Sequence, residues 1–430
     1  MLDLKFIREN PDVVRTSLEH RKMEASLDEL LEADRKWRAV LGEVESLRSH
    51  QNTVSKEISQ LKKAKVDASE QIAEMRKVSQ KIKTLNEQAQ RYKSKVDEIV
   101  MTIPNLPHAS TPIGDSAEDN PEIKRWGEIP TFDFEPKPHW ELAEAQDIVD
   151  FQRGAKIAGS NFVLFKGLGA RLERALINFM LDLHTSKHGY TEVSPPFVAN
   201  RQAMTGTGQL PKFEADMYRC DRDEENETND LFLIPTAEVP VTNIFAGEIL
   251  NGNDLPIYYT AYTPCFRREA GAYGRDTRGL QRIHQFDKVE MVKFTLPETS
   301  YDEHESLLKD VEDVLQALKL PYRIVQHCTG ELSFAAAKCY DIELWAAVEE
   351  KFSLEISSCS NYEDFQSRRA NIRFRRERGA KPEFVHTLNA SGTALPRLVI
   401  AILENYQQAD GSIRVPEVLK PYMGGIEQIG

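Results

Sequence analysis

A run of regularly spaced apolar residues constrains the fold of this chain more than any other feature of its sequence. The run spans residues 37–99 and is broken once, at Lys62–Ser69. Its members are Trp37, Leu41, Val44, Leu47, Gln51, Val54, Ile58 and Leu61 before the break, and Ile72, Met75, Val78, Ile82, Leu85, Ala89, Tyr92, Val96 and Ile99 after it. Spacings of three and four over about four heptads in each half are typical of a coiled-coil seam. Because the break is short and polar, the pattern predicts an antiparallel helical arm over about residues 27–100.

The charge of the chain is divided unevenly between this arm and the rest. The 430 residues include 55 Lys and Arg against 68 Asp and Glu, which gives a net charge of −13. Residues 35–95 carry 15 basic and 7 acidic groups, a net charge of +8, so the remaining residues carry −21. An acidic total usually argues against a nucleic-acid partner, but a basic, elongated arm can bind an RNA backbone by shape and charge. A dimerisation or spacer coiled coil is the alternative interpretation of the arm.

Composition and cysteine usage exclude several classes of protein. Hydrophobic residues at 40% and charged residues at 29% are typical of a soluble globular chain. No uncharged apolar run approaches the roughly 18 residues of a membrane helix, so we expect no membrane partner. Asp3, Lys5 and Arg8 occupy the region where a secretory signal needs an apolar core. The five cysteines form no CxxC pair, which predicts a reducing cytoplasm and neither a disulfide scaffold nor a zinc site.

Three parts are expected along the chain. Residues 1–103 would form an N-terminal domain that carries the arm. Residues 104–139 contain seven of the 21 prolines, which indicates a linker. From residue 140 to 430, helical segments such as Arg171–His188 mix with strand-like runs, which predicts an α+β catalytic body.

The segment Tyr262–Phe294 is the strongest candidate for a functional site. Two strand-like runs flank a loop rich in glycine and arginine. Side chains alternate between the faces of a strand, so Arg267 and Glu269 are expected to share one face. The return strand is expected to present Arg282, His284, Phe286, Lys288 and Glu290 together. Arginine suits phosphate, an aromatic ring can stack on a base, and a carboxylate can bind an amine or hydroxyl. A surface ladder of salt bridges is the alternative.

Two further segments carry polar residues that suit a phosphate ligand. Glu355 and Ser358 offer hard oxygen ligands of the kind that Mg²⁺ accepts, although they differ in strand parity and can meet only if the strand twists or ends between them. Asn389–Arg397 is a small-residue turn that leads into a helix, and Arg397 in its first turn would favour an anion. A buried strand and an ordinary helix start are the respective alternatives.

In this order, these segments resemble the class II aminoacyl-tRNA synthetases and, in detail, the bacterial-type seryl-tRNA synthetases. The likeness covers essentially the whole chain. The most specific stretches are GTGQLPKF (206–213), IPTAEVP (234–240), CFRREAGAYGRDTRGLQRIHQFDKVE (265–290), EISSCSN (355–361), HTLNASG (386–392) and ENYQ (404–407). The resemblance implies an α+β fold, in which an antiparallel-sheet catalytic domain flanked by helices follows a tRNA-binding coiled-coil arm. The helix that begins at Arg171 would build a homodimer interface.

The implied activity is that of a serine–tRNA ligase, an ATP-dependent enzyme of the cytoplasm. Such an enzyme activates L-serine with ATP to seryl-adenylate and transfers the seryl group to the 3′-terminal adenosine of tRNA-Ser, with tRNA-Sec as an allowed second acceptor. Mg²⁺ is the implied cofactor. An activating enzyme that charges a carrier other than tRNA is the alternative from the same fold, and the basic arm argues against it. A coiled-coil interaction protein is the alternative from another class, and it leaves the hairpin residues without a role.

The resemblance also implies roles for individual residues. The implied catalytic residues are Arg267, Glu269 and Arg397. Serine would be bound by Thr236, Ala237, Glu238, Arg267, Glu290 and Ser391. ATP would be bound by Arg267, Arg268, Glu269, Arg282, Phe286, Glu355, Ile356, Ser357, Ser358 and Arg397. Mg²⁺ would be held by Glu355 and Ser358.

Overall fold

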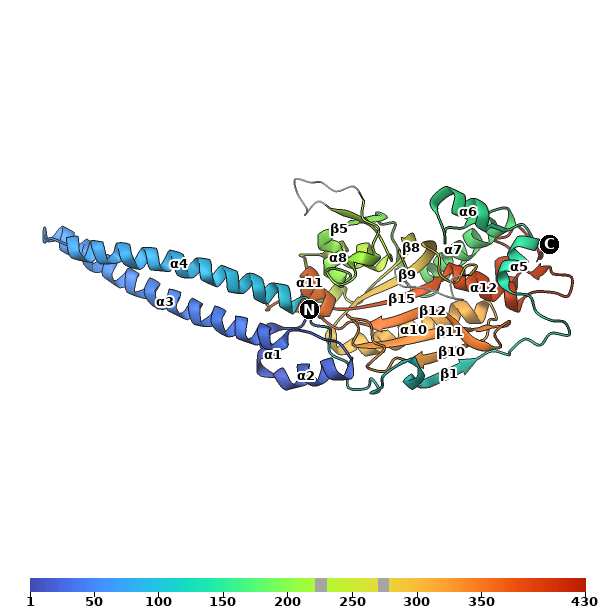
Figure 1. The fold of residues 1–430 in the computed structure, drawn as a ribbon, viewed down its shortest axis with the longest axis horizontal. Coiled ribbons are helices and arrows are strands. Elements are labelled where there is room, and N and C mark those ends of the chain that lie inside the picture. The colour runs from blue at the N-terminus through green and yellow to red at the C-terminus, as the bar shows by residue number, and fades with distance from the viewer. Residues whose placement is uncertain (221–229, 270–277) are drawn as a thin grey trace. The chain divides into compact units, whose positions relative to one another are not determined.

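A computed structural model describes residues 1–220, 230–269 and 278–430 of the chain (Figure 1). These residues divide into two compact units. The arm unit is Leu2–Glu19 with Met23–Pro104, and the body is Met1, His20–Lys22 and Asn105–Gly430. Residues 270–277 of the predicted glycine-rich and arginine-rich loop lie outside the described residues.

The helices and strands have the following bounds. The α-helices are α1 Leu4–Glu9, α2 Pro11–His20, α3 Leu27–Lys63, α4 Ser69–Val100, α5 His139–Ala145, α6 Phe151–Ala158, α7 Leu168–Ser186, α8 Arg201–Thr207, α9 Glu238–Thr242, α10 Ser300–Ala317, α11 Phe365–Ala370 and α12 Leu395–Asn405. The strands are β1 Glu122–Trp126, β2 Val149–Asp150, β3 Leu164–Phe165, β4 Thr191–Glu192, β5 Val198–Asn200, β6 Leu231–Leu233, β7 Ile249–Asn251, β8 Ile257–Phe266, β9 Gln285–Thr295, β10 Tyr322–Gln326, β11 Lys338–Ala346, β12 Lys351–Asn361, β13 Arg373–Arg375, β14 Glu383–Phe384, β15 His386–Ala394, β16 Ile413–Arg414 and β17 Gln428–Ile429.

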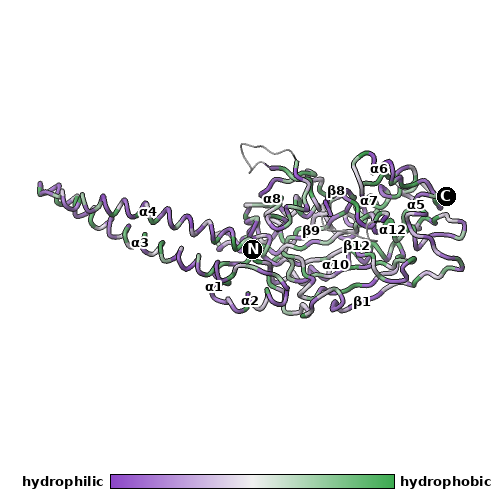
Figure 2. Tube along the Cα trace, viewed as in Figure 1, coloured by the Kyte–Doolittle hydropathy of each residue, from purple (hydrophilic) through white to green (hydrophobic). Residues whose placement is uncertain are grey.

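Helices α3 and α4 form the antiparallel pair that the heptad pattern predicts. Lys81 on α4 pairs with Glu43 on α3 at 2.6 Å, and the side-chain amide of Gln51 donates to the hydroxyl of Ser79 at 2.7 Å. An apolar seam of Val44, Ile82 and Leu85 lies between the helices, and Val40, Leu47 and Val78 pack against it. At 37 residues, α3 extends about 55 Å. Outside this seam the arm helices are mostly hydrophilic (Figure 2).

Eight of the described strands form one sheet in the body, in the order β1-β10-β11-β12-β15-β9-β8-β4 (Figure 1). Neighbouring strands are antiparallel except for the parallel pair of β4 and β8. Helices α7, α10 and α12 pack against this sheet and share its main apolar core. Val289 and Met291 of β9 enter that core, and so do Leu388 and Ala390 of β15. Because side chains alternate along a strand, the residues between them face the opposite side of the sheet.

None of the described helices is long and apolar enough to cross a membrane. All five cysteines are free thiols.

Candidate active site

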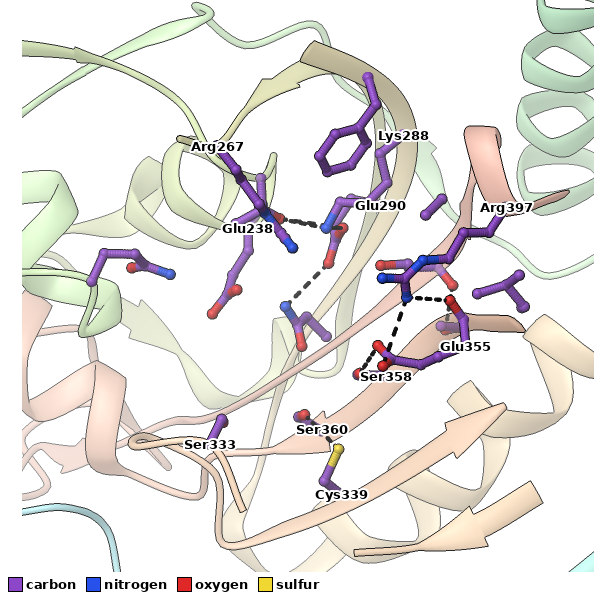
Figure 3. Close-up of a pocket in the computed structure, with 18 of the residues that line it drawn as sticks. Glu238, Arg267, Lys288, Glu290, Ser333, Cys339, Glu355, Ser358, Ser360 and Arg397 are labelled. Atoms are coloured by element: carbon purple, nitrogen blue, oxygen red, sulfur yellow. Dashed lines mark hydrogen bonds and ion pairs between the residues drawn. The ribbon is translucent and has the colours of Figure 1, made fainter. Parts of the chain in front are cut away.

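The sheet face opposite the helical core lines a cavity of about 320 Å³. Figure 3 shows side chains from several strands converging on it. The predicted site residues that line the cavity are Thr236, Glu238, Arg267, Glu269, Arg282, Phe286, Glu290, Glu355, Ile356, Ser357, Ser358, Ser391 and Arg397. The fold therefore brings together side chains that are up to 161 positions apart in the sequence, from Thr236 to Arg397.

Two of the predicted residues do not line this cavity. Ala237, directly before α9, is fully buried in an apolar cluster. The guanidinium of Arg268 lies 5.9 Å from the centre of the Tyr218 ring, and its backbone N–H donates to the carbonyl of Asp216 at 3.1 Å.

At one end of the cavity, a buried network surrounds Glu290 on β9. Lys288 forms an ion pair with this carboxylate and donates to the hydroxyl of Thr236 at 2.8 Å. Thr236 in turn donates to Glu290 Oε2 at 3.3 Å, and the amide of Asn389 donates to Glu290 Oε1 at 3.1 Å. Glu290 is 1% exposed, so the carboxylate would be costly to bury without these donors. The network fixes a negative group on the cavity wall (Figure 3).

Glu238, at the start of α9, is a second buried carboxyl group at the same end. The side-chain amide of Gln366 donates to it at 2.6 Å. The hydroxyl of Thr387 donates to the carbonyl oxygen of that amide at 2.8 Å, which fixes the orientation of Gln366. Burial and the nearby carboxylate of Glu290 raise the pKa of Glu238 to about 7, against the opposing effect of Gln366. A cation bound beside Glu238 would favour the ionised, negatively charged form of its carboxyl group.

Arg267, just after β8, and Phe286 on β9 lie beside each other on the cavity wall. The guanidinium lies 5.3 Å from the centre of the Phe286 ring, and its Nε donates to the carbonyl of Pro235 at 3.3 Å. Phe286 on β9 pairs with Cys265 on β8, and Cys265 is two positions before Arg267 in the sequence. The site therefore presents a positive charge beside a half-buried aromatic ring, which suits a nucleotide.

The hairpin differs from the predicted one at its open end. β8 ends at Phe266, so Arg267 and Glu269 lie beyond the strand, and Glu269 has a positive φ of 48°. Both still line the cavity, and Glu269 accepts from Arg282 at 3.2 Å. His284 was expected on the cavity face, but it precedes β9 and its ring bonds to the hydroxyl of Tyr218 at 2.6 Å. Strand alternation does not extend past the last ladder pair, which explains both differences.

A β-bulge brings Glu355 and Ser358 to the same face of β12. Across β11 and β12, Glu343 pairs with Glu355 and Ile342 pairs with Ser357, so Ile356 is an extra residue. The extra residue reverses the alternation that had placed the two side chains on opposite faces. The Ser358 hydroxyl lies 3.4 Å from Glu355 Oε1.

Core packing shows the same reversal along β12. Leu354 enters the helical core before the bulge and Cys359 enters it after the bulge, five positions later. Glu355, Ser358 and Ser360 therefore all face the cavity. The two side chains were expected to meet only if the strand twisted or ended between them, and a bulge brings them together instead.

Arg397, in the first turn of α12, closes this second end of the cavity. Its Nη1 donates to the backbone carbonyl of Glu355 at 2.6 Å and lies 3.7 Å from the Glu355 carboxylate. The carboxylate of Asp341 raises the pKa of Glu355, and the charge of Arg397 opposes that shift. The two acidic groups and the arginine suit a cation and an anion bound side by side.

Three residues of the site network were not assigned a role from sequence. Lys288 was expected on the cavity face, but its pairing with Glu290 was not foreseen. Asn389 is two positions before Ser391 on β15 and so shares its face. This spacing could have identified Asn389 as a cavity residue. Gln366 on α11 reaches Glu238 across 128 positions, and no local pattern could have identified it.

Comparison with known proteins identifies the family. Residues 1–107 match the family model described as the seryl-tRNA synthetase N-terminal domain, and residues 218–406 match the tRNA synthetase class II core domain (G, H, P, S and T). The chain is 56% identical over 430 residues to the serine–tRNA ligase of Geobacter sulfurreducens, and the match covers 100% of both chains. This chain belongs to the seryl-tRNA synthetase family. A second member of that family, from Caldanaerobacter subterraneus, is 58% identical over 423 residues, with 98% of each chain covered.

Solved structures of seryl-tRNA synthetases share the fold along the full length. The enzyme of Pyrococcus horikoshii complexed with ATP superimposes with a TM-score of 0.93 at 39% identity, and covers 100% of this chain and 99% of that one. The cytoplasmic enzyme of Naegleria fowleri in complex with AMP gives 0.87 at 31% identity, with 100% and 98% covered. The predicted α+β class II fold with its coiled-coil arm is confirmed. Neither structural match favours the alternative of an enzyme that charges another carrier.

Proposed function

We propose that the cavity activates L-serine with ATP to seryl-adenylate and that the chain transfers the seryl group to the 3′-terminal adenosine of tRNA-Ser. One observation carries this proposal. In a full-length relative of serine–tRNA ligases, two buried carboxyl groups lie at one end of a cavity whose other residues suit a nucleotide. The cavity volume of about 320 Å³ lies within the range of small-ligand sites.

The end of the cavity around Glu238 and Glu290 is proposed to bind serine. The ammonium group of serine would pair with Glu238 and donate to the hydroxyl of Thr236, with Glu290 also near it. Glu290 and Ser391 would bond the serine hydroxyl, and Arg267 would pair with its carboxylate. Alanine would leave Glu290 without that hydroxyl bond, and sites of this kind discriminate by about 10⁴–10⁵. Threonine carries the hydroxyl and must be excluded by the space around its methyl group.

The opposite end is proposed to bind ATP. Phe286 would stack on the adenine, and Glu269, held by Arg282, would accept a hydrogen bond from its amino group. Arg267 would contact the α-phosphate and Arg397 the γ-phosphate. Ile356 and Ser357 lie between Glu355 and Ser358 on β12 and also line the cavity.

Mg²⁺ is proposed to be held by Glu355 and Ser358. The two oxygens lie 3.4 Å apart on one face of β12, and hard oxygen ligands of this type fit the cation. The carboxylate of Asp341 nearby adds negative charge that a cation would relieve. When bound, Mg²⁺ neutralises charge on the phosphates of ATP.

The protein would catalyse activation by position and charge, without a covalent nucleophile. A carboxylate oxygen of serine attacks the α-phosphorus, and the bond from that phosphorus to the pyrophosphate oxygen breaks. Arg267 and Arg397 hold the reacting groups in line and stabilise the charge that develops on the phosphates. A ribose hydroxyl of the tRNA terminus then attacks the seryl carbonyl, and AMP leaves.

The remaining parts of the proposal concern partners and organisation. The basic helices α3 and α4 would bind tRNA-Ser, and tRNA-Sec is proposed as a second acceptor. We also propose that the chain forms a homodimer through α7 and is located in the cytoplasm. Its proposed division is an N-terminal domain at 1–103, a linker at 104–139 and a catalytic domain at 140–430. No zinc is expected to take part in either chemical step.

Removing the guanidinium of Arg267 tests the proposal directly. Arg267→Ala should reduce serine-dependent ATP–pyrophosphate exchange by about a thousandfold, because this group contacts both reactants. Arg378→Ala, which removes an exposed arginine, is the matched control and should exchange at the wild-type rate. Unchanged exchange in Arg267→Ala, or exchange supported equally by alanine, would show that the site is wrongly assigned.

A further inference from the structure

A cluster of His327, Cys339 and Asp341 lies beside the cavity, outside the proposed catalytic residues. His327 directly follows β10, and its backbone N–H donates to the carbonyl of Cys339 on β11 at 3.0 Å. Cys339 and Asp341 are two positions apart on β11 and so share one face. The paired backbones therefore fix the three Cα positions, and His327 and Cys339 line the cavity.

The side-chain atoms of this cluster converge. One ligand atom from each residue lies within 4.8 Å of the other two. His327 Nε2 is 2.7 Å from Asp341 Oδ2, and the Cys339 sulfur is 3.8 Å from Asp341 Oδ1. The hydroxyl of Ser360 donates to that sulfur at 3.3 Å.

A second observation points to a ligand at this cluster. The Nδ1 atom of His327 is buried and has no hydrogen-bond partner among the described residues. The His327 side chain is only 12% exposed, so solvent offers it little compensation. Because Nε2 already pairs with Asp341, Nδ1 is the ring nitrogen left to meet a ligand, and a buried polar atom without a partner is unfavourable.

We propose that His327, Cys339 and Asp341 form a binding site for a thiophilic divalent cation of the Zn²⁺ type. Thiolate, imidazole and carboxylate are the ligands of such ions, and three protein ligands leave a fourth position open towards the cavity. On binding, the sulfur–metal bond replaces the S–H bond, and the thiol proton passes to the solvent. The proposal departs from the expectation of no zinc site, which rested on the absence of a CxxC pair.

The proposed site is distinct from the proposed Mg²⁺ position. The two ligand sets share no residue, although Asp341 pairs with Ser358 across β11 and β12. Mg²⁺ prefers all-oxygen ligands, so a sulfur and a ring nitrogen select against it. The cluster can therefore be probed without serine, ATP or tRNA.

Cobalt spectroscopy on the full chain, stripped of metal by a chelator, tests the proposal. Adding Co²⁺ alone should produce the near-ultraviolet charge-transfer absorption of a thiolate–cobalt bond, saturating at a single ion per chain. Excess Mg²⁺ should leave this band in place and Zn²⁺ should remove it. Cys339→Ser should abolish the band, whereas Cys220→Ser, at a partly exposed cysteine, should retain it.

His327→Gln keeps the proposal open to refutation if Cys339→Ser fails to fold. The substitution should weaken Co²⁺ binding by roughly tenfold or more. Zn²⁺ should raise the thermal unfolding midpoint of the wild-type chain but not that of His327→Gln. Absence of the charge-transfer band in the wild-type chain would overturn the proposal. A band that survives in both Cys339→Ser and His327→Gln would overturn it as well.

Discussion

Glu238 is a cavity carboxyl group whose pKa lies well above the ordinary value of a glutamate. Burial and the carboxylate of Glu290 raise its pKa to about 7, so the empty cavity holds this group mostly protonated below that pH. The ammonium of serine pairs only with the ionised form. Below pH 7, serine binding must therefore release the proton of Glu238.

The affinity for serine should follow this proton. We expect the dissociation constant of serine to fall about tenfold per pH unit as the pH rises towards 7, and to level off above it. Calorimetry between pH 5 and 8 measures this directly. Glu238→Gln should bind serine weakly and with no such slope. A wild-type affinity that is flat across this range would contradict the assigned role of Glu238.

Several residue-scale features could be predicted from sequence and others could not. Phe286, Lys288 and Glu290 were expected on one face because strand alternation is a local rule, and all three line the cavity. Gln366 could not be predicted, because its contact with Glu238 depends on the packing of α11 against β15 and α8. The joint placement of His327 and Cys339 likewise depends on a strand pairing that no spacing in the sequence reveals.

At the scale of elements, the arm was easier to predict than the sheet. Its seam repeats along two helices that pair with their immediate neighbour, so local spacing determines the structure. Strand β12 shows the opposite case. Its bulge at Ile356 is defined by the register with β11, so alternation alone placed Glu355 and Ser358 on opposite faces.

The seam of the arm should be sensitive to the loss of a single side chain. Leu85→Ala removes a residue that is 8% exposed and should lower the opening free energy of the arm by about 2 kcal/mol. Amide hydrogen exchange in α3 and α4 would then be roughly 30-fold faster, with α12 unaffected.

Val66→Ala is the matched control for this change. Val66 lies in the turn that connects α3 to α4 and is 53% exposed. Its truncation should therefore leave amide hydrogen exchange in the arm unchanged. Equal effects of the two substitutions would show that the seam around Leu85 does not stabilise the arm.

For the whole molecule, the distribution of charge matters more than its sum. The net charge of −13 combines a stretch at 35–95 of +8 with a remainder of −21. We expect the KM for tRNA to rise steeply with salt, since counterions compete with the arm for phosphates, while the KM for serine changes little. Aminoacylation assays from 50 to 200 mM salt measure both. Equal salt dependence of the two constants would contradict a role of the arm in binding RNA.

Replacing residues 35–95 with a short Gly/Ser turn tests the central claim most directly, because it separates the two proposed activities in one protein. Serine-dependent ATP–pyrophosphate exchange requires only the cavity, so it should stay within about twofold of the full chain. Charging of purified tRNA-Ser should fall by about a hundredfold or more, because the phosphate contacts of the arm are lost. Charging that persists at the wild-type rate would show that the arm is only a spacer, and loss of exchange would show that serine activation does not reside in the body alone.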